Sequence, residues 1–335
     1  MKTKTYLALV FDGMAKGLFA SLIIGVIINS IGKLAGIPMI EDIGKAAQFL
    51  MGPCIGVGVA LKRGSKQFAL LAAAAAGALG AGTFILAGGV WGVRVGEPVG
   101  ALIAALCAIE VARLIEGKTK FDLLIVPAVM VIIGGLFGAF VSPVIARFMG
   151  WLGEGVNYLT LIQPLPMGIL LGISVGIILT LPISSAALCI AIGINGLAAG
   201  AALAGCCAQM VGFAVISFRE NKTSGLVSQG LGTSMIQVPN IIKNPLIWIP
   251  PTIAGGICGV LATMVFKMET NSVGAGMGTS GLVGQMMTAD VMGPTAQTFI
   301  NIALLHFVIP AAVSLIIAEF MRVKGWIKPG DLKLG

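Results

Sequence analysis

Residues 155–218 read GVNYLTLIQPLPMGILLGISVGIILTLPISSAALCIAIGINGLAAGAALAGCCAQMVGFAVISF, 64 residues without a single Asp, Glu, Lys or Arg. As a continuous helix this run would extend about 96 Å, because each helical residue adds about 1.5 Å. The hydrocarbon core of a bilayer is about 30 Å thick. The run therefore predicts about three membrane crossings.

Helix-breaking residues divide this run. Pro164 and Pro166 suit the first turn of a helix, and Pro182 ends that helix. The Asn195-Gly196 pair separates a short middle segment, 183–194, from the run 197–218. The middle segment is too short to span a bilayer unless the protein is thin there.

The whole chain is too apolar for a soluble protein. Of its 335 residues 57% are hydrophobic and 10% are charged, with a mean hydropathy of +1.03, whereas soluble domains carry about 25% charged residues. Residues 244–266 and 291–318 are further runs without charge. We therefore expect an all-α polytopic membrane protein with about ten crossings: 14–34, 43–61, 67–91, 97–115, 122–146, three within 155–218, 246–266 and 296–321.

Basic residues gather in short connectors. The cluster Lys62-Arg63-Gly64-Ser65-Lys66 and the end of the chain, 322–333, hold much of the formal charge of +8. This pattern is typical of cytoplasmic loops rather than of a nucleic-acid surface, so we expect a multi-pass protein of the cell membrane with both termini cytoplasmic. The six cysteines form no CxxC pair and lie in apolar runs, which indicates small core residues and neither a metal site nor a cofactor.

Acidic residues within the apolar helices have basic neighbours at helical spacing. Glu110 and Arg113 are three residues apart, as are Glu319 and Arg322. Such pairs neutralise charge near the bilayer, and we expect them to be structural.

Two stretches fit neither a crossing nor an ordinary loop. Residues 225–243 and 271–289 are rich in Gly, Ser, Thr and Gln, nearly uncharged, and interleaved with apolar residues. Irregular backbone at membrane depth is tolerated where it packs in protein or lines a cavity. We interpret both as re-entrant hairpins, with surface loops as the alternative.

Neutral polar side chains on and near these stretches are the candidate binding residues. Residues 276–281 match GxGxxG, but no strand precedes them, so a dinucleotide site is not indicated. Exposed amides and hydroxyls suit sugar hydroxyls or an anion. His306 lies in an apolar run and could bind substrate, relay a proton or pack with one satisfied hydrogen bond, whereas Gln209 could join helices or face the cavity. The predicted substrate-binding residues are Gln209, Gln229, Thr233, Ser234, Gln237, Asn240, Thr279, Ser280, Gln285 and His306. No catalytic residue is predicted.

Several motifs carry a resemblance to a known family. Residues 244–250, NPLIWIP, resemble a motif of the sugar-specific IIC membrane components of the bacterial phosphotransferase system. Residues 181–185, 205–210, 229–234 and 274–281 look like a compact IIC-like type that has been given the label toxin regulator. The match is strongest from about 180 to 310.

The resemblance implies an elevator-type fold of the glucose superfamily, with ten spans and two re-entrant hairpins. It implies a scaffold and homodimerisation domain at 1–150 and a transport domain at 151–335. It also implies a membrane transporter of a small polar solute, a sugar, with IIA and IIB subunits as possible partners besides membrane lipid. At most, the chain would be the membrane component of a PEP-dependent sugar phosphotransferase.

The sequence departs from the larger enzymes at one position. Their sugar-binding Glu falls near Thr233 and Ser234 here, and no carboxylate lies between Asn221 and Phe266. Whether a phosphorylation step accompanies binding is therefore left open. A membrane sensor that kept this fold without transport is the alternative function. An intramembrane enzyme is not indicated, because no nucleophile, base and orienting group appear at workable spacing.

Overall fold

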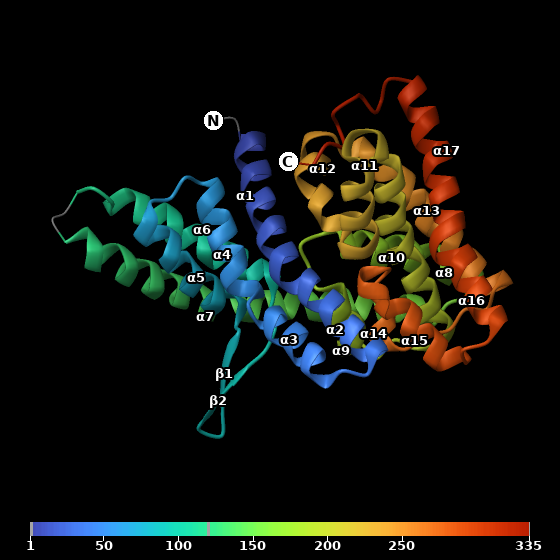
Figure 1. The fold of residues 1–335 in the computed structure, drawn as a ribbon, viewed down its shortest axis with the longest axis horizontal. Helices are drawn as coiled ribbons and strands as arrows, with labels where there is room; N and C mark the ends of the chain where they lie inside the picture. Colours follow the sequence, from blue (N-terminus) through green and yellow to red (C-terminus); the bar gives the residue numbers. More distant parts are fainter. Residues whose placement is uncertain (1–2, 119–120, 335) are drawn as a thin grey trace. The chain divides into compact units, whose positions relative to one another are not determined.

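The computed structural model describes residues 3–118 and 121–334, and it divides into two compact units between Phe148 and Met149 (Figure 1). The described residues are mainly helical, as predicted, with one two-stranded hairpin.

The first unit consists of helices that pack through small residues. Its elements are α1 (Thr3–Leu18), a π-helical turn (Phe19–Ile23), α2 (Ile24–Ala35), α3 (Pro38–Phe49), α4 (Met51–Lys62), α5 (Gln67–Ala81), β1 (Phe84–Ala87), β2 (Val90–Val93), α6 (Pro98–Ile115) and the start of α7 (Asp122–Thr160). A Cβ atom on Gly56 would lie 1.9 Å from the carbonyl oxygen of Ala73. Only glycine at position 56 allows α4 and α5 to approach this closely.

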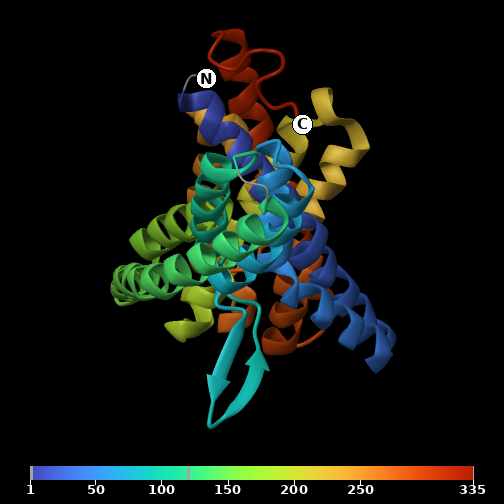
Figure 2. The ribbon, with the colours of Figure 1, turned by 90° about the vertical axis from the view of Figure 1, so that its left-hand side faces the viewer.

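The hairpin corrects one predicted crossing. The run 67–91 is helical only to Ala81, because Gly82 ends α5 in the left-handed conformation at φ 64°. Phe84–Ala87 then pairs antiparallel with Val90–Val93 across Gly88 and Gly89, whose φ values of 58° and 81° suit a tight two-residue turn. The hairpin protrudes from the helices α5 and α6 that it joins (Figure 2).

The second unit surrounds the buried helix α10. Its elements are the end of α7, α8 (Pro164–Thr180), α9 (Ser185–Ala191), α10 (Gly196–Ile216), α11 (Phe218–Val227), α12 (Val238–Lys243), α13 (Ile249–Val260), α14 (Ser272–Ala275), α15 (Val283–Met292), α16 (Ala296–Ile302) and α17 (Ile309–Val323). Helix α10 packs against α8, α13 and α17 (Figure 1). A Cβ atom on Gly205 would lie 2.0 Å from the carbonyl oxygen of Gly172, so α8 and α10 touch backbone to backbone.

Within residues 3–118 and 121–334, six helical stretches are long and apolar enough to cross a membrane: Tyr6–Lys33, Pro98–Ile115, Asp122–Val141, Gly196–Ile216, Pro245–Val265 and Ala296–Val323. Helices α3 and α4, bent by 49° at a break, form a possible seventh span, and α5 and α8 are shorter apolar helices. The predicted crossing at 183–194 is too short, because its helix α9 has seven residues and covers only about 10 Å. The total of ten crossings stays a prediction.

Ion pairs reach further along the chain than helical spacing indicates. Glu319 pairs with Arg322 at 2.6 Å, as expected, and also with Arg219 at 3.1 Å. Glu110 lies 3.9 Å from Arg113 but only 2.7 Å from Arg63, which comes from the connector after α4.

Candidate functional site

The first broken stretch, residues 225–243, interrupts its helices inside the second unit. Helix α11 ends at Val227, a π-helical turn follows over Ser228–Gly232, and Thr233 is fully extended. A 3₁₀ turn, Ser234–Gln237, leads into α12. Gln229, Ser234 and Gln237 are all completely buried. A solvated surface loop does not fit this burial, and the position of the stretch in a membrane remains a prediction.

The second broken stretch, residues 271–289, is organised by left-handed residues. The Asn271 side chain caps α14 by accepting hydrogen bonds from the backbone N–H groups of Val273 and Gly274. Gly278, Gly281 and Leu282 then have φ values of 56°, 53° and 59° before α15 begins. A left-handed conformation costs a non-glycine residue such as Leu282 about 1–2 kcal/mol. Such local strain is typical of ligand sites and switch regions.

The two broken stretches touch each other. The Thr279 hydroxyl donates a hydrogen bond to the backbone carbonyl of Gly230, within the π-helical turn of the first stretch. Thr279 itself is completely buried and also lies 3.6 Å from the sulfur of Met210 on α10. Two segments about fifty residues apart in sequence therefore meet beside the central helix.

Gln209 is the centre of the first of three polar clusters. Its side-chain oxygen accepts hydrogen bonds from the Thr180 hydroxyl at 3.2 Å and from the Trp248 indole N–H at 3.0 Å. Its amide nitrogen donates to the Thr252 hydroxyl at 3.1 Å, and the Thr180 and Ser234 hydroxyls are 2.8 Å apart. The cluster joins α8, α10, α13 and the first broken stretch through uncharged groups.

The second cluster joins Gln229, Gln237 and Asn240. Gln237 donates to the Gln229 side-chain oxygen at 2.8 Å, and Asn240 donates to the Gln237 side-chain oxygen at 2.8 Å. Gln237 and Asn240 also donate to the backbone carbonyls of Leu332 and Lys333, at 3.1 and 2.9 Å. These amides therefore bind the chain's own C-terminal residues in this structure.

The third cluster contains polar atoms without a partner. Gln285 Nε2 lies 3.2 Å from His306 Nδ1 and 3.4 Å from the Cys207 sulfur. Gln285 Oε1, His306 Nε2 and the Ser280 hydroxyl are buried and have no hydrogen-bond partner. A buried polar group without a partner costs about 1–3 kcal/mol, so a ligand that hydrogen-bonds here gains that energy.

A π-helical turn positions His306. The turn spans Ala303–Val308, and the Ile309 N–H reaches back to the Leu304 carbonyl. The cause lies in Pro310, which has no N–H to donate to the carbonyl of His306, four residues earlier. Such π-helical turns are frequent at functional sites.

All ten predicted residues lie in the second unit, where seven of them form the three clusters and Thr279 joins the two broken stretches. The Ser280 hydroxyl has no hydrogen-bond partner in the part of the chain that the structure describes, and the Thr233 side chain caps the following turn by accepting from the Met235 N–H. Sequence reasoning missed Thr180, Trp248 and Thr252. Trp248 lies in the quoted motif 244–250, which was the one signal available. Among the described residues, no group of three His, Cys, Asp or Glu could hold a metal ion.

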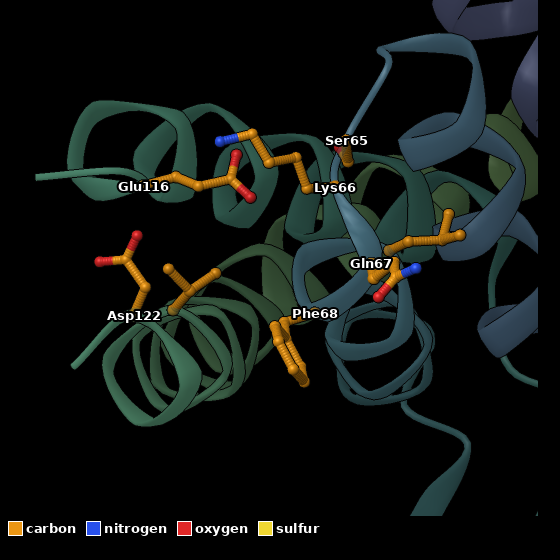
Figure 3. Close-up of a pocket in the computed structure, with 8 residues that line it drawn as sticks. Ser65, Lys66, Gln67, Phe68, Glu116 and Asp122 are labelled. Atoms are coloured by element: carbon orange, nitrogen blue, oxygen red, sulfur yellow. The ribbon is translucent and has the colours of Figure 1, made fainter. Parts of the chain in front are cut away.

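Two clefts lie away from these clusters. One of 530 Å³ in the first unit is lined by Lys66, Phe68, Glu116 and Asp122 (Figure 3), and one of 400 Å³ in the second unit is lined by residues such as Asn157. None of the ten predicted residues lines either cleft.

Several long apolar helices, together with two helix interruptions that hold buried, uncharged polar side chains, are typical of a multi-pass membrane protein. The sequence family described as "Phosphotransferase system, EIIC" matches residues 9–334, and the chain belongs to this family. The predicted resemblance is confirmed, and it extends well before residue 180. No match was found among curated proteins or among solved structures. Family membership implies work in a membrane together with IIA and IIB components.

Proposed function

We propose that this protein is a phosphotransferase-type permease component that carries a neutral hydroxylated solute, a sugar, across the cell membrane. Family membership supports the reaction class. The uncharged character of the three buried clusters supports the solute class, because sugar hydroxyls both donate and accept hydrogen bonds.

The observation that carries the proposal is the set of unpartnered atoms beside the broken stretches. Gln285 Oε1 can accept a hydrogen bond, His306 Nε2 can donate one because Nδ1 faces the Gln285 amide nitrogen, and the Ser280 hydroxyl can do either. No carboxylate lies between Asn221 and Phe266, so nothing in the first broken stretch favours a cation. A neutral polyol fits such a set of groups better than a charged metabolite does.

The two units support a division of labour. Under this proposal the unit Met149–Gly335, which contains both broken stretches, carries the solute by an elevator motion. The other unit, Met1–Phe148, is the scaffold through which two copies form a homodimer. Both chain ends lie on the cytoplasmic side, where Lys62 and Lys66 place the positive charge.

A binding and uptake experiment tests the proposal. Purified protein is screened with a panel of hexoses, hexitols and disaccharides by ligand-induced thermal stabilisation, and the best binder is then offered to proteoliposomes. We expect Gln285→Ala to weaken binding at least tenfold, which corresponds to about 1.4 kcal/mol. Thr288→Val is the matched control, because Thr288 is buried on the same helix but bonds only the backbone of Gly284.

Two results would refute the proposal. One is full sugar affinity in Gln285→Ala, and the other is the absence of binding and uptake for every neutral sugar in the panel. Addition of phosphorylated IIB partner to loaded vesicles then decides whether sugar or sugar phosphate is released.

A further inference from the structure

The residues after α17 follow a defined path over the second unit. We call Trp326–Leu334 the tail segment. Gly325 and Gly330, with φ values of 73° and 93°, turn the chain back after α17, and the tail segment then passes beside α11 and α12 (Figure 1).

Side chains of α11 hold the tail segment by its backbone. The Glu220 carboxylate accepts hydrogen bonds from the N–H groups of Gly330 at 3.0 Å and Leu332 at 2.9 Å. Asn221 donates to the Leu332 carbonyl at 2.8 Å and accepts from the Leu334 N–H at 2.9 Å.

Side chains of the first broken stretch hold the same backbone from the other side. Gln237 and Asn240 donate to the Leu332 and Lys333 carbonyls. Most of these bonds involve backbone atoms of the tail segment, so they recognise an extended peptide rather than a particular sequence. Selectivity comes from Leu332, whose side chain is completely buried in a cluster with Phe213 and Ile241.

Outside these contacts, Asn244 donates to the Trp326 carbonyl at 3.1 Å and to the Asp331 carboxylate at 2.7 Å. Ile327 and Leu332 are the buried residues of the tail segment, whereas Lys328, Gly330 and Lys333 are exposed. It forms no helix or strand. Because ordering a chain costs conformational entropy at every residue, a segment without helix or strand and with two buried side chains opens more readily than the buried helices do.

The contacts connect the tail segment to the polar clusters. Gln237 donates both to the Leu332 carbonyl and to Gln229, and it lies three residues after Ser234 in the same 3₁₀ turn. Ser234 is bonded through Thr180 to Gln209. The tail segment therefore restrains the part of the first broken stretch that carries Ser234.

We propose that Glu220, Asn221, Gln237 and Asn240 form a binding site for an extended peptide with a buried leucine, and that the tail segment is its releasable ligand. Release frees the first broken stretch to rearrange. The consequence for solute handling rests on the proposed function, whereas binding of the tail segment does not.

Hydrogen exchange on the full chain in detergent tests this without any solute. In the unaltered protein we expect the amides of Gly330, Leu332 and Leu334 to exchange together, at least tenfold faster than those of α10. Leu332→Asp should raise exchange across residues 228–240 at least tenfold and leave α10 unchanged. An excess of the peptide WIKPGDLKL, residues 326–334, should restore protection.

Lys333→Ala is the matched control, because Lys333 contributes its backbone carbonyl and its side chain is exposed. If Leu332→Asp does not fold, Glu220→Gln replaces it, since the amide keeps the shape, removes the charge and replaces one of the two accepting oxygens by an NH2 group that cannot accept. Tail amides as slow as those of α10 would overturn the proposal. The proposal would also be overturned if the peptide failed to slow amide exchange of residues 228–240 in Leu332→Asp. If the unaltered protein releases the tail segment as expected but takes up no sugar, the proposed function alone is contradicted.

Discussion

Replacement of Gln209 by leucine tests whether the first polar cluster stabilises the fold as its geometry indicates. Leucine has a similar volume, so the packing of α10 is kept while three hydrogen bonds are lost. Thr180 keeps its contact with Ser234, and Thr252 keeps its bond to the Trp248 carbonyl. The indole N–H of Trp248 has no other hydrogen bond given by the structure.

The expected loss follows from these partners. The unpaired indole N–H costs about 1–3 kcal/mol, reduced here because Trp248 is only half-buried. Hydrogen bonds between membrane helices contribute about 0.6 kcal/mol on average and at most about 1.7 kcal/mol. We therefore expect Gln209→Leu to lower the free energy of unfolding by about 2–3 kcal/mol.

A double-mutant cycle isolates the bond to Trp248. Trp248→Phe removes the indole N–H, so Gln209→Leu should be about 1 kcal/mol less costly in the Trp248→Phe background. The assay is reversible unfolding in mixed micelles, followed by circular dichroism as denaturing detergent is added. If the loss in the double variant equals the sum of the two single losses within about 0.3 kcal/mol, the two side chains form no stabilising hydrogen bond.

A close helix contact, a shared carboxylate and a turn give three more tests. Gly205→Ala places a Cβ 2.0 Å from the Gly172 carbonyl and should cost about 1–3 kcal/mol in the same assay, whereas Gly155→Ala, with open space around it, should change stability by less than about 0.5 kcal/mol. Equal losses would contradict the close contact. Glu110→Gln should cost about 1–3 kcal/mol because Arg63 is nearly buried, while Asp42→Asn, which breaks an exposed pair, should cost less than about 0.5 kcal/mol. Gly88→Val should raise amide exchange of residues 84–93 about tenfold, since a left-handed valine costs about 1–2 kcal/mol; Gly92→Ala is the control, and unchanged exchange in Gly88→Val would contradict the turn.

Local chemistry made much of this fold predictable. Pro164 starts α8, and α10 begins at the pair Asn195-Gly196, with Asn195 just before its first residue, at the positions that helix-breaking residues indicate. Glycine-rich stretches interrupted their helices where expected. The hairpin after α5 was missed because residues 84–93 are as apolar as a membrane helix, and hydropathy does not distinguish the two. Gly82 and the pair Gly88-Gly89 were the available signals.

Hydrogen bonds between residues that are distant in sequence could not be predicted from local patterns. Trp248 reaches Gln209 across 39 residues, and the Leu332 carbonyl reaches Gln237 across 95. Nothing in the local pattern distinguishes Gln237, which binds the tail segment, from Gln285, which has an unpartnered oxygen. Both were predicted as solute ligands on the same neutral, glycine-rich background.

The backbone contact between Gly205 and Gly172 has a practical consequence for spectroscopy. Because no side chain separates α8 from α10, the two helices form one rigid reference frame within their unit. A spin label on an exposed residue of α8, such as Leu170, would mark a fixed position within this unit. Distances from that position to a second label at Leu231 would register any displacement of the π-helical turn separately from tumbling of the whole protein.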